Sequence, residues 1–444
     1  MRRIMLLFTT FCFCITTTHA QWINQNAGFT NRTLGFYEIS IVDKDIVWAI
    51  CYDGIGGLMG PAHVLDFIRT TDGGTTWMPG QVGTDSSLAF SNICALSATE
   101  AWVAMHKFDL STGGGVFHTT DGGTTWTQSG VGTIFDNNSF PNFVWFKDPM
   151  NGIAGGDANG GYFEIHTTTD GGATWTRTPQ ANVPPFVTNG GAGWFDGFCV
   201  LGDTVWFGTN RGQMYKSTDF GQTWSVSTVS PQGYTVYEIA FLDDGQHGLT
   251  HVRSGSATML FATADGGATW TQRTTHPKWK QSKLTAVPGT NRFVSTSVTA
   301  NRGSAYSIDN GLTWVEIDNA TPKAACRFLD STTGWAGGYF NDVPGVAPIS
   351  GGIYKWDPTT LRVVNINPAK AATVYPNPAT DKITISFADN RSGHSLRFYN
   401  AVGKLVKEVD GVTSGEIDIA ALPGGLYFIR SASDAGVRLK FIKQ

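Results

Sequence analysis

Short apolar runs separated by turns rich in glycine and aspartate fill most of this 444-residue chain. Seven of these runs carry a large apolar residue just after a short turn, and each follows another apolar run, such as 143–146 or 239–242. Runs of about four to eight apolar, β-branched and aromatic residues between turn signals are typical of β-strands. The pattern therefore predicts an all-β domain with seven repeats, marked by Trp48, Trp102, Ile153, Trp206, Leu249, Phe293 and Trp335.

An octapeptide with the pattern Ser/Thr-x-Asp-x-Gly-x-Thr-Trp occurs six times, and we call each copy a box. Consecutive box tryptophans are 49, 49, 49, 46 and 44 residues apart, which is the regular spacing of a repeat architecture. The residue types are those of a tight turn. An Asp carboxylate accepts hydrogen bonds from N–H groups one to three residues ahead, and a Gly two residues later supplies a positive φ angle.

The box residues are interpreted as structural, because a calcium loop would need several acidic ligands where each box has one. The tryptophan of each box is expected to enter the next strand and to cover the turn. The box aspartates are Asp72, Asp121, Asp170, Asp219, Asp265 and Asp309. The box tryptophans are Trp77, Trp126, Trp175, Trp224, Trp270 and Trp314.

The box resembles the Asp-box, or bacterial neuraminidase repeat, which lies between the third and fourth strands of β-propeller blades. Sialidases, xyloglucanases, sortilin-type receptors and photosystem II assembly factors carry it, so the resemblance implies a fold and no single activity. The seventh repeat, around Tyr354, has no box after it, and the sequence QWIN at 21–24 is similar to the strand that follows a box. We expect residues 21–28 to complete the last blade and close one seven-bladed propeller over residues 21–360.

The chain after the repeats predicts a separate module. Residues 361–373 are interpreted as a linker, and the short alternating runs of 374–444 predict a small antiparallel, Ig-like β-sandwich. The sequences VYPNP, YNAVGK and LPGGLY in this segment resemble the type A C-terminal sorting domain of the type IX secretion system of Bacteroidota. The motif residues are Pro376, Asn377, Pro378, Gly425 and Tyr427. This resemblance implies recognition by the type IX secretion machinery at the outer membrane, followed by removal of the domain.

Residues 1–20 predict a secretory signal peptide, with Arg2 and Arg3 before an apolar run and Thr18-His19-Ala20 at its end. The run of about 12 residues is too short for a membrane span, and no later segment is apolar enough to be one. We therefore expect transit through the periplasm and a final location in the medium or on the outer-membrane surface, as a monomer.

Composition and charge narrow the possible partners. Only 15% of residues are charged while 12% are aromatic, which excludes a disordered or coiled-coil protein. Residues 21–373 hold 20 Lys and Arg against 28 Asp and Glu, a net charge of −8, whereas residues 374–444 have a net charge of +2. An acidic main domain disfavours nucleic acid and anionic lipid as partners.

The sequence indicates neither a metal site nor a cofactor. It contains no CxxC pair, so a zinc site is not expected. The four cysteines after the signal peptide lie far apart within apolar runs, which favours buried free thiols over disulfides. They are Cys51, Cys94, Cys199 and Cys326.

Ligand-binding candidates come from loops on the face opposite the boxes, because loops there are long: 52–66, 106–115, 130–141, 179–194 and 339–352. Aromatic rings in loops suit sugar or protein surfaces, and cation–π pairs are possible at Lys278-Trp279-Lys280. The alternative, that these rings plug the central channel or cover blade edges, stays open. The candidates are Trp194, Trp279, Tyr339, Phe140, Phe186, Arg211 and Arg253.

Two functions fit these features. A glycoside hydrolase would need two carboxylates across a groove, for which Asp157, Asp196 and Asp342 are candidates, or the arginine cluster of a sialidase. The only trace of a sialidase motif is the sequence FIR at 67–69, in the wrong order and without proline. The sequence therefore favours a non-catalytic module that recognises a protein or a glycan, with no catalytic residues, and the hydrolase is the alternative.

Overall fold

The computed structural model describes the chain outside its N-terminal segment, part of its loops and the segment between its two units. The described residues are 22–25, 34–53, 64–135, 139–186, 192–231, 233–298, 301–319, 321–338, 352–358, 372–387, 394–401, 404–431 and 438–444. The chain divides into two compact units, Met1–Thr360 and Leu361–Gln444. The predicted signal peptide and most of the predicted linker lie outside the described residues.

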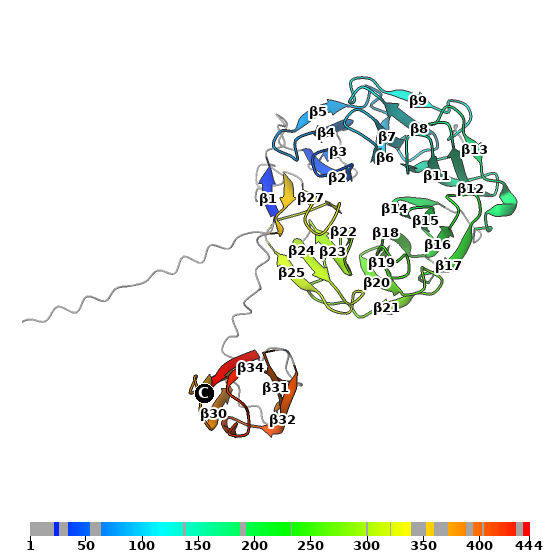
Figure 1. Ribbon diagram of the computed structural model, residues 1–444. Coiled ribbons are helices and arrows are strands. Elements are labelled where there is room, and N and C mark those ends of the chain that lie inside the picture. Colours follow the sequence, from blue (N-terminus) through cyan, green and yellow to red (C-terminus); the bar gives the residue numbers. More distant parts are fainter. Residues whose placement is uncertain are drawn as a thin grey trace, which may run out of the picture. The chain divides into compact units, whose positions relative to one another are not determined.

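Seven four-stranded antiparallel sheets form the first unit, and Figure 1 shows them arranged as blades around a ring. Blade 1 contains β2 (Leu34–Ile41), β3 (Val47–Asp53), β4 (Asp66–Thr70) and β5 (Met78–Gln81). Blade 2 contains β6 (Leu88–Ala95), β7 (Ala101–Lys107), β8 (Gly114–Thr119) and β9 (Thr127–Ser129). Blade 3 contains β10 (Pro141–Phe146), β11 (Gly152–Asn159), β12 (Tyr162–Thr168) and β13 (Thr176–Arg177).

The remaining blades follow the same order. Blade 4 contains β14 (Gly193–Leu201), β15 (Thr204–Thr209), β16 (Gln213–Ser217) and β17 (Ser225–Thr228). Blade 5 contains β18 (Thr235–Phe241), β19 (Gly248–Ser254), β20 (Ala257–Thr263) and β21 (Thr271–Arg273). Blade 6 contains β22 (Lys283–Val287), β23 (Arg292–Ser297), β24 (Gly303–Ser307) and β25 (Val315–Asp318). Blade 7 contains β26 (Ala325–Phe328), β27 (Gly334–Gly337), β28 (Ile353–Trp356) and β1 (Trp22–Gln25).

Both ends of the unit contribute to blade 7, as the sequence predicts. Strand β1 pairs antiparallel with β28, and Trp22 lies opposite Trp356 while Gln25 lies opposite Ile353. The innermost strands of neighbouring blades contact each other around the whole ring, from β2 and β6 through to β26 and β2. This closure removes the open end that a stack of sheets would expose. The fold is therefore the predicted all-β, seven-bladed propeller.

The core of the propeller lies between blades. The seven large residues that mark the second strands are all buried, with at most 1% of their surface exposed. Most of them fill the space beside the box glycine of the next blade, where a Cβ atom would meet Trp102 at Gly172 or Ile153 at Gly221. A box glycine therefore has two roles. Its positive φ angle forms the turn, and its lack of a side chain leaves room for a residue of the neighbouring blade.

Cations add a second contact between blades. The guanidinium of Arg69 lies over the Trp48 ring, and its Nε donates to the carbonyl of Gly122 in the next box. Lys355 of blade 7 lies over Trp335 in the same way, and its Nζ donates to the carbonyl of Gly73 in the box of blade 1. Each of these two box carbonyls is therefore held by a cation of the preceding blade.

The boxes lie on the same face as the turns between the first and second strands. Gly73 N–H donates to Asp45 O, Gly122 N–H to Thr99 O, and Gly171 N–H to Met150 O, each across 2.9–3.0 Å. The loops after each second strand and the connections between blades lie on the opposite face, because strands alternate in direction.

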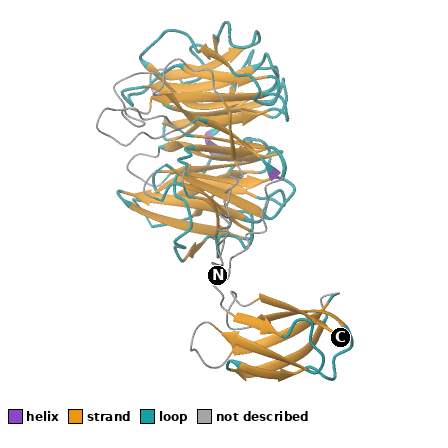
Figure 2. Ribbon diagram, turned by 90° about the vertical axis from the view of Figure 1, so that its left-hand side faces the viewer, coloured by secondary structure: helices purple, strands orange, loops and turns teal. Residues whose placement is uncertain are grey.

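The second unit is a small β-sandwich. One sheet contains β29 (Ala372–Tyr375), β30 (Lys382–Phe387) and β33 (Gly415–Asp418). The other contains β32 (Leu405–Val412), β31 (His394–Asn400), β34 (Gly425–Ser431) and β35 (Arg438–Lys443), in that order. Buried apolar side chains from both sheets form one core. In Figure 2, strands and their connecting loops make up nearly all of the described chain.

Candidate functional site

Each box carboxylate is held entirely by its own turn. In the first box, Asp72 Oδ1 accepts from Thr76 N–H at 2.9 Å and from the Thr70 hydroxyl at 2.8 Å, and Oδ2 accepts from the Thr76 hydroxyl at 2.6 Å. Thr70 Oγ1 in turn accepts from Gly74 N–H. The other five boxes repeat this set of hydrogen bonds.

The turn is wider than the sequence predicts. The N–H donor to the carboxylate lies four residues ahead of the aspartate, at Thr76 in the first box, and not one to three residues ahead. Two successive residues with positive φ angles, Gly73 at 68° and Gly74 at 85°, turn the chain back so that Thr76 faces Asp72. The hydroxyl and then the N–H of Thr76 lower the pKa of Asp72 to about 2. The same pKa of about 2 is found for Asp121, Asp170 and Asp265.

The box tryptophans face the preceding blade. Trp126 lies 5.8 Å from Phe67 of blade 1, and Trp175 lies 6.4 Å from Trp102 of blade 2, as distances between ring centroids. Trp175 Nε1 also donates to Ser129 Oγ of blade 2. The box face is therefore occupied by contacts that join blades, with its carboxylates ionised and hydrogen-bonded.

Three predicted aromatic candidates are used inside the fold. Trp279 is 1% exposed and packs beside His251, so it cannot meet a ligand at the surface. Phe140 is half-buried and stacks on His106 at 4.6 Å between ring centroids. Phe186 is half-buried against Phe163. These rings cover blade edges, which is the alternative that the sequence leaves open.

The other candidates are less informative about a ligand. The Arg253 guanidinium lies over Tyr237 at 4.8 Å and donates to Gln281 O. Arg211 is half-buried in the turn between β15 and β16, where its N–H donates to Thr209 Oγ1. Tyr339 and the side chain of Trp194 lie outside the described residues. The structure therefore does not gather the five described candidates into one site.

Asp157 is the one candidate acid whose side chain is described. Its Oδ1 accepts from Asn142 Nδ2 at 2.8 Å and from Gly193 N–H at 2.9 Å, so it joins blade 3 to blade 4. Burial raises the pKa of Asp157 to about 6, against the effect of these two donors. Asp342 and the side chain of Asp196 lie outside the described residues.

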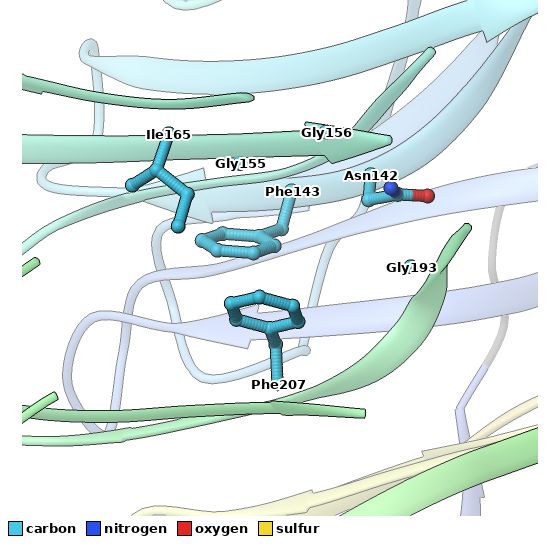
Figure 3. A pocket seen from close by; sticks show the side chains of 7 residues that line it. All are labelled: Asn142, Phe143, Gly155, Gly156, Ile165, Gly193 and Phe207. Carbon is cyan, nitrogen blue, oxygen red and sulfur yellow. The ribbon is translucent and has the colours of Figure 1, made fainter. Parts of the chain in front are cut away.

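The space beside Asn142 and Gly193 is filled. Figure 3 shows Phe143 and Phe207 facing each other there, with Ile165 alongside. The residual space has essentially no room for a water-sized sphere, at about 0 Å³. A Cβ atom at Gly155 would meet the Phe143 ring at 2.4 Å. Among the described residues, Asp157 therefore lies beside a packed core.

A second buried acid was not found from the sequence. Burial alone would raise the pKa of Glu164, but hydrogen bonds from His166, Asn159 and the N–H of Phe135 lower it to about 2. His166 Nε2 lies 2.9 Å from Glu164 Oε1, and both side chains are buried. No sequence signal marks this pair, because Glu164 and His166 occupy alternate positions of an ordinary strand.

The inner strands enclose a cavity of about 240 Å³ in the centre of the ring. Its wall is mainly apolar and includes Trp145, Leu201 and Phe241, and it contains the ion pair between Glu38 and Arg327 at 3.2 Å. A second ion pair, Lys283 with Glu238 at 3.1 Å, is buried near it. The cations of both pairs are engaged by carboxylates, and the lining also includes Asp243, whose Oδ2 accepts from Gly289 N–H.

An open groove of about 570 Å³ lies on the outer rim between blades 3 and 4. We call it the rim groove, and it is lined by Gly161, Tyr162, Gln180, Ala181, Asn182, Val183, Pro184, Pro185, Thr223 and Trp224. None of these described lining residues is an acid, a histidine, a cysteine, a lysine or an arginine. Its aromatic and amide side chains can bind a ligand but cannot exchange protons with it near neutral pH.

The groove exists because the outermost strand of blade 3 is short. Strand β13 has two residues and pairs only with His166 and Thr167 of β12, which leaves Tyr162 uncovered by it. The chain then turns through a 3-10 helix, η2 (Gln180–Asn182), toward blade 4. Other outermost strands have three or four residues.

The walls of the rim groove are fixed by hydrogen bonds from the blades. Trp224 N–H donates to Asn182 O at 2.9 Å, and the Tyr215 hydroxyl donates to Pro184 O at 3.2 Å. The Arg177 guanidinium lies 4.1 Å from the centre of the Tyr162 ring. The groove is therefore a preformed site in which Tyr162 and the exposed Gln180 present an aromatic ring and an amide.

The cysteines agree with the prediction from the sequence. All four cysteines after the predicted signal peptide are free, and burial raises the pKa of Cys94 and of Cys326 to about 12. Within the described ranges no cluster of three or more His, Cys, Asp or Glu could hold a metal ion. Among the same residues, no helix is long and apolar enough to cross a membrane.

The predicted sorting motif has a definite place in the second unit. Asn377 Oδ1 accepts from Ile442 N–H at 2.9 Å, and its Nδ2 donates to Lys440 O at 3.3 Å. Tyr427 is buried against Phe441, and its hydroxyl donates to Pro423 O at 2.7 Å. Pro376 and Pro378 both follow cis peptide bonds, and Gly425 begins β34. The motif residues thus bind the last strand to the rest of the domain.

Comparison with known proteins agrees with both units. Residues 373–444 match the family described as the secretion system C-terminal sorting domain. YCF48 from Cyanidioschyzon merolae is 16% identical, with a TM-score of 0.52, over 77% of this chain and 100% of that one. The GH74 enzyme of Niastella koreensis is 13% identical, with a TM-score of 0.42, over 95% of this chain and 74% of that one.

No curated protein matches the chain. The likeness to YCF48 supports the fold alone, since identity this low does not carry an activity. The family match confirms the predicted sorting domain. The chain is a seven-bladed β-propeller joined to a type IX secretion sorting domain.

Proposed function

We propose that the propeller is a non-catalytic recognition module for a protein or a glycan, exported through the type IX system to the medium or the cell surface. The observation that carries this proposal is the lining of the rim groove. The groove is open and about 570 Å³ in volume, within the usual range of about 300–1,000 Å³ for ligand sites. Its lining holds no side chain that could act as a general acid or base near neutral pH.

The groove favours an uncharged ligand. Without a cation or an anion in the lining, a charged ligand would lose its hydration and gain no ion pair. The Tyr162 ring and the Gln180 amide offer an apolar face beside hydrogen-bonding groups. Neutral sugars and uncharged peptide segments both carry this mixture of apolar and polar surface.

One observation favours the alternative, a glycoside hydrolase. The pKa of Asp157 is raised to about 6, and a raised pKa is what a carboxyl needs to act as a general acid. However, Asp157 lies beside a packed core, and its Oδ1 is engaged by two donors of the fold. We therefore assign Asp157 to the junction of blades 3 and 4.

A glycan array and a polysaccharide-release assay on the full-length protein test the proposal. The substitution Tyr162→Ala should weaken ligand binding about tenfold or more, and Gln180→Ala should weaken it less. The matched control is Gln272→Ala, an exposed glutamine on β21 in blade 5, outside the rim groove. Melting temperatures check that each variant is folded. Tyr162→Phe is the conservative variant, because it keeps the aromatic ring beside Arg177.

The two functions give different results in these assays. Binding without sugar release, lost in Tyr162→Ala and kept in Gln272→Ala, supports the recognition module. Sugar release by the wild type that disappears in Asp157→Asn would overturn it in favour of the hydrolase. Binding that is unchanged in both rim-groove variants would place the ligand elsewhere on the propeller.

A further inference from the structure

The two faces of the sorting-domain sandwich differ in chemistry. On the three-stranded sheet, the outward residues of β30 and β33 are polar or charged, and Lys382 pairs with Glu416 at 3.0 Å. On the four-stranded sheet, the outward positions of β34 and β35 include Leu426, Phe428 and Ile442, each between 39% and 47% exposed. An alternating strand normally places polar residues outward, so this sheet departs from the rule.

Strand register brings these apolar residues together. Leu426 lies opposite Ile442, and Phe428 lies opposite Tyr399, which in turn lies opposite Leu405. We call these five residues the outer patch: Tyr399, Leu405, Leu426, Phe428 and Ile442. They span all four strands of one sheet face, whereas the exposed apolar residues of blade 6, Ile308, Leu312 and Val315, lie in its box and at the start of the strand after it. A contiguous apolar patch of this kind is typical of an interaction surface.

Cationic side chains border the outer patch. Arg397 and Arg430 are paired across β31 and β34, and the Arg430 guanidinium lies 5.8 Å from the centre of the Tyr399 ring. Lys440 lies opposite Phe428 and is exposed. Two carboxylates accompany these three cations: Glu408 meets Arg397 at 2.7 Å, and Asp410 accepts from the Ser395 hydroxyl and helps Glu408 to raise the pKa of Arg397. The border therefore carries a positive excess, which complements an acidic rim on a partner.

The neighbouring strand edge is less suited to a partner than the face. Residues of the VYPNP segment and the following alanine cover the edge of β35: Asn377 bonds to Ile442 N–H and Lys440 O, and Ala379 N–H donates to Ile442 O. A partner strand would have to displace these hydrogen bonds to extend the sheet. The sheet face requires no such displacement.

We propose that the outer patch is the surface by which the type IX secretion machinery docks the sorting domain. The partner surface is apolar at its centre and bordered by carboxylates. This inference rests on the export route of the proposed function, and it adds which face of the domain is recognised. The sorting motif then holds the last strand in place, and the outer patch makes the contact.

The test follows export of the full-length chain in a bacterium with a type IX system. The double substitution L426S/F428S removes apolar surface from the outer patch without touching the buried Tyr427 or Ile429. Export to the cell surface and medium should fall about tenfold or more, with intact precursor accumulating in the periplasm. The matched control K382S/E416S changes two exposed residues of the other sheet and should be exported like the wild type.

Two further measurements keep the result interpretable. The conservative double substitution L426M/F428L keeps the surface apolar and should restore export. The melting curve of each purified full-length variant should match that of the wild type. A clear loss of stability in L426S/F428S would overturn the proposal, because it would mean that the outer patch is covered within the folded protein.

Other outcomes are equally decisive. Normal export of L426S/F428S, or an equal loss of export in K382S/E416S, would overturn docking through the outer patch. Deletion of 374–444 tests the export route itself. If the deleted protein still reached the surface, the type IX route would fail, whatever the outer-patch variants showed.

Discussion

Blade 7 and the six blades with boxes reach the same four-stranded sheet by different routes. In a blade with a box, the outermost strand follows the third strand directly through the box turn, so both strands are local in sequence. In blade 7, the outermost strand β1 comes from the other end of the unit and pairs with β28. Blade 7 therefore shows which contacts hold a blade together when its outermost strand is not connected through a box turn.

The contacts at the two kinds of junction are alike. Trp22 Nε1 donates to Ser304 Oγ of the preceding blade at 3.0 Å, as Trp175 Nε1 donates to Ser129 Oγ at 2.9 Å. Trp22 is also buried against Trp356 at 4.9 Å between ring centroids. The tryptophan of β1 therefore takes the place of a box tryptophan, although the chain reaches it by a different path.

Removal of residues 21–28 tests most directly whether the ring needs its closing strand β1. We expect the melting temperature of the propeller to fall by more than about 10 °C, because the deletion removes a strand and a buried Trp and exposes the edge of β28. Removal of 371–444 should leave the propeller transition nearly unchanged, because those residues belong to the other compact unit. Calorimetry of the three chains measures both effects.

Equal effects of the two deletions would show that β1 contributes no more to the propeller than the sorting domain does. A large effect of the first deletion alone would establish non-covalent closure as the source of ring stability. The deleted chain can be rescued by a synthetic peptide of residues 21–28 only if the β1 site survives, which provides an independent check.

A second prediction compares single tryptophans. Trp22→Ala should cost about 3–5 kcal/mol of unfolding free energy, since the indole is buried and packs on Trp356 and Phe328. Trp175→Ala should cost roughly half as much, because Trp175 is only partly buried. Denaturant unfolding of both variants measures the difference. A larger cost for Trp175→Ala would contradict the dependence of the ring on its closing strand.

The sequence predicts the repeated parts of this fold and the closing strand, for a physical reason. The column from Trp48 to Trp335 and the boxes recur because each blade must fill the same space beside its neighbour, so the same residue types return at a fixed spacing. Strand β1 is recognisable because Trp22 meets the requirement that a box tryptophan meets elsewhere. Patterns that repeat seven times are visible in one sequence.

The candidate site is much less predictable from the sequence, because it forms where the regular repeat of the blades is interrupted. Trp279 looks like a loop aromatic in the sequence, yet it is buried, since no periodicity distinguishes a ring that covers a blade edge from one that meets a ligand. The rim groove arises because β13 ends after two residues and the chain turns through η2. The Glu38–Arg327 pair joins residues 289 apart in the sequence, a contact that only the ring closure creates.

The two kinds of junction differ in chemistry, because each box contains an aspartate that titrates whereas β1 contains no titratable side chain. The N–H and then the hydroxyl of Thr125 hold the pKa of Asp121 at about 2, below its ordinary value of 3.8. A carboxyl with a lowered pKa in the folded state stabilises the protein above its unfolded pKa, and this contribution is lost as the pH falls through the folded value. The boxes should therefore lose stabilisation between about pH 4 and pH 2, whereas the residues of β1 (WINQ) carry no charge to lose.

The substitution Asp121→Asn isolates this effect in a single box. At pH 7 the variant should melt below the wild type, because the amide replaces an ionised acceptor of the Thr119 and Thr125 hydrogen bonds. As the pH falls toward 2, the wild-type carboxyl is protonated and the difference in melting temperature should shrink to nearly zero. A difference in melting temperature that stays constant from pH 7 to pH 2 would show that the box depends on the shape of the Asp121 side chain and not on its charge. The blades with boxes would then be no more sensitive to acid than blade 7, which is closed by β1.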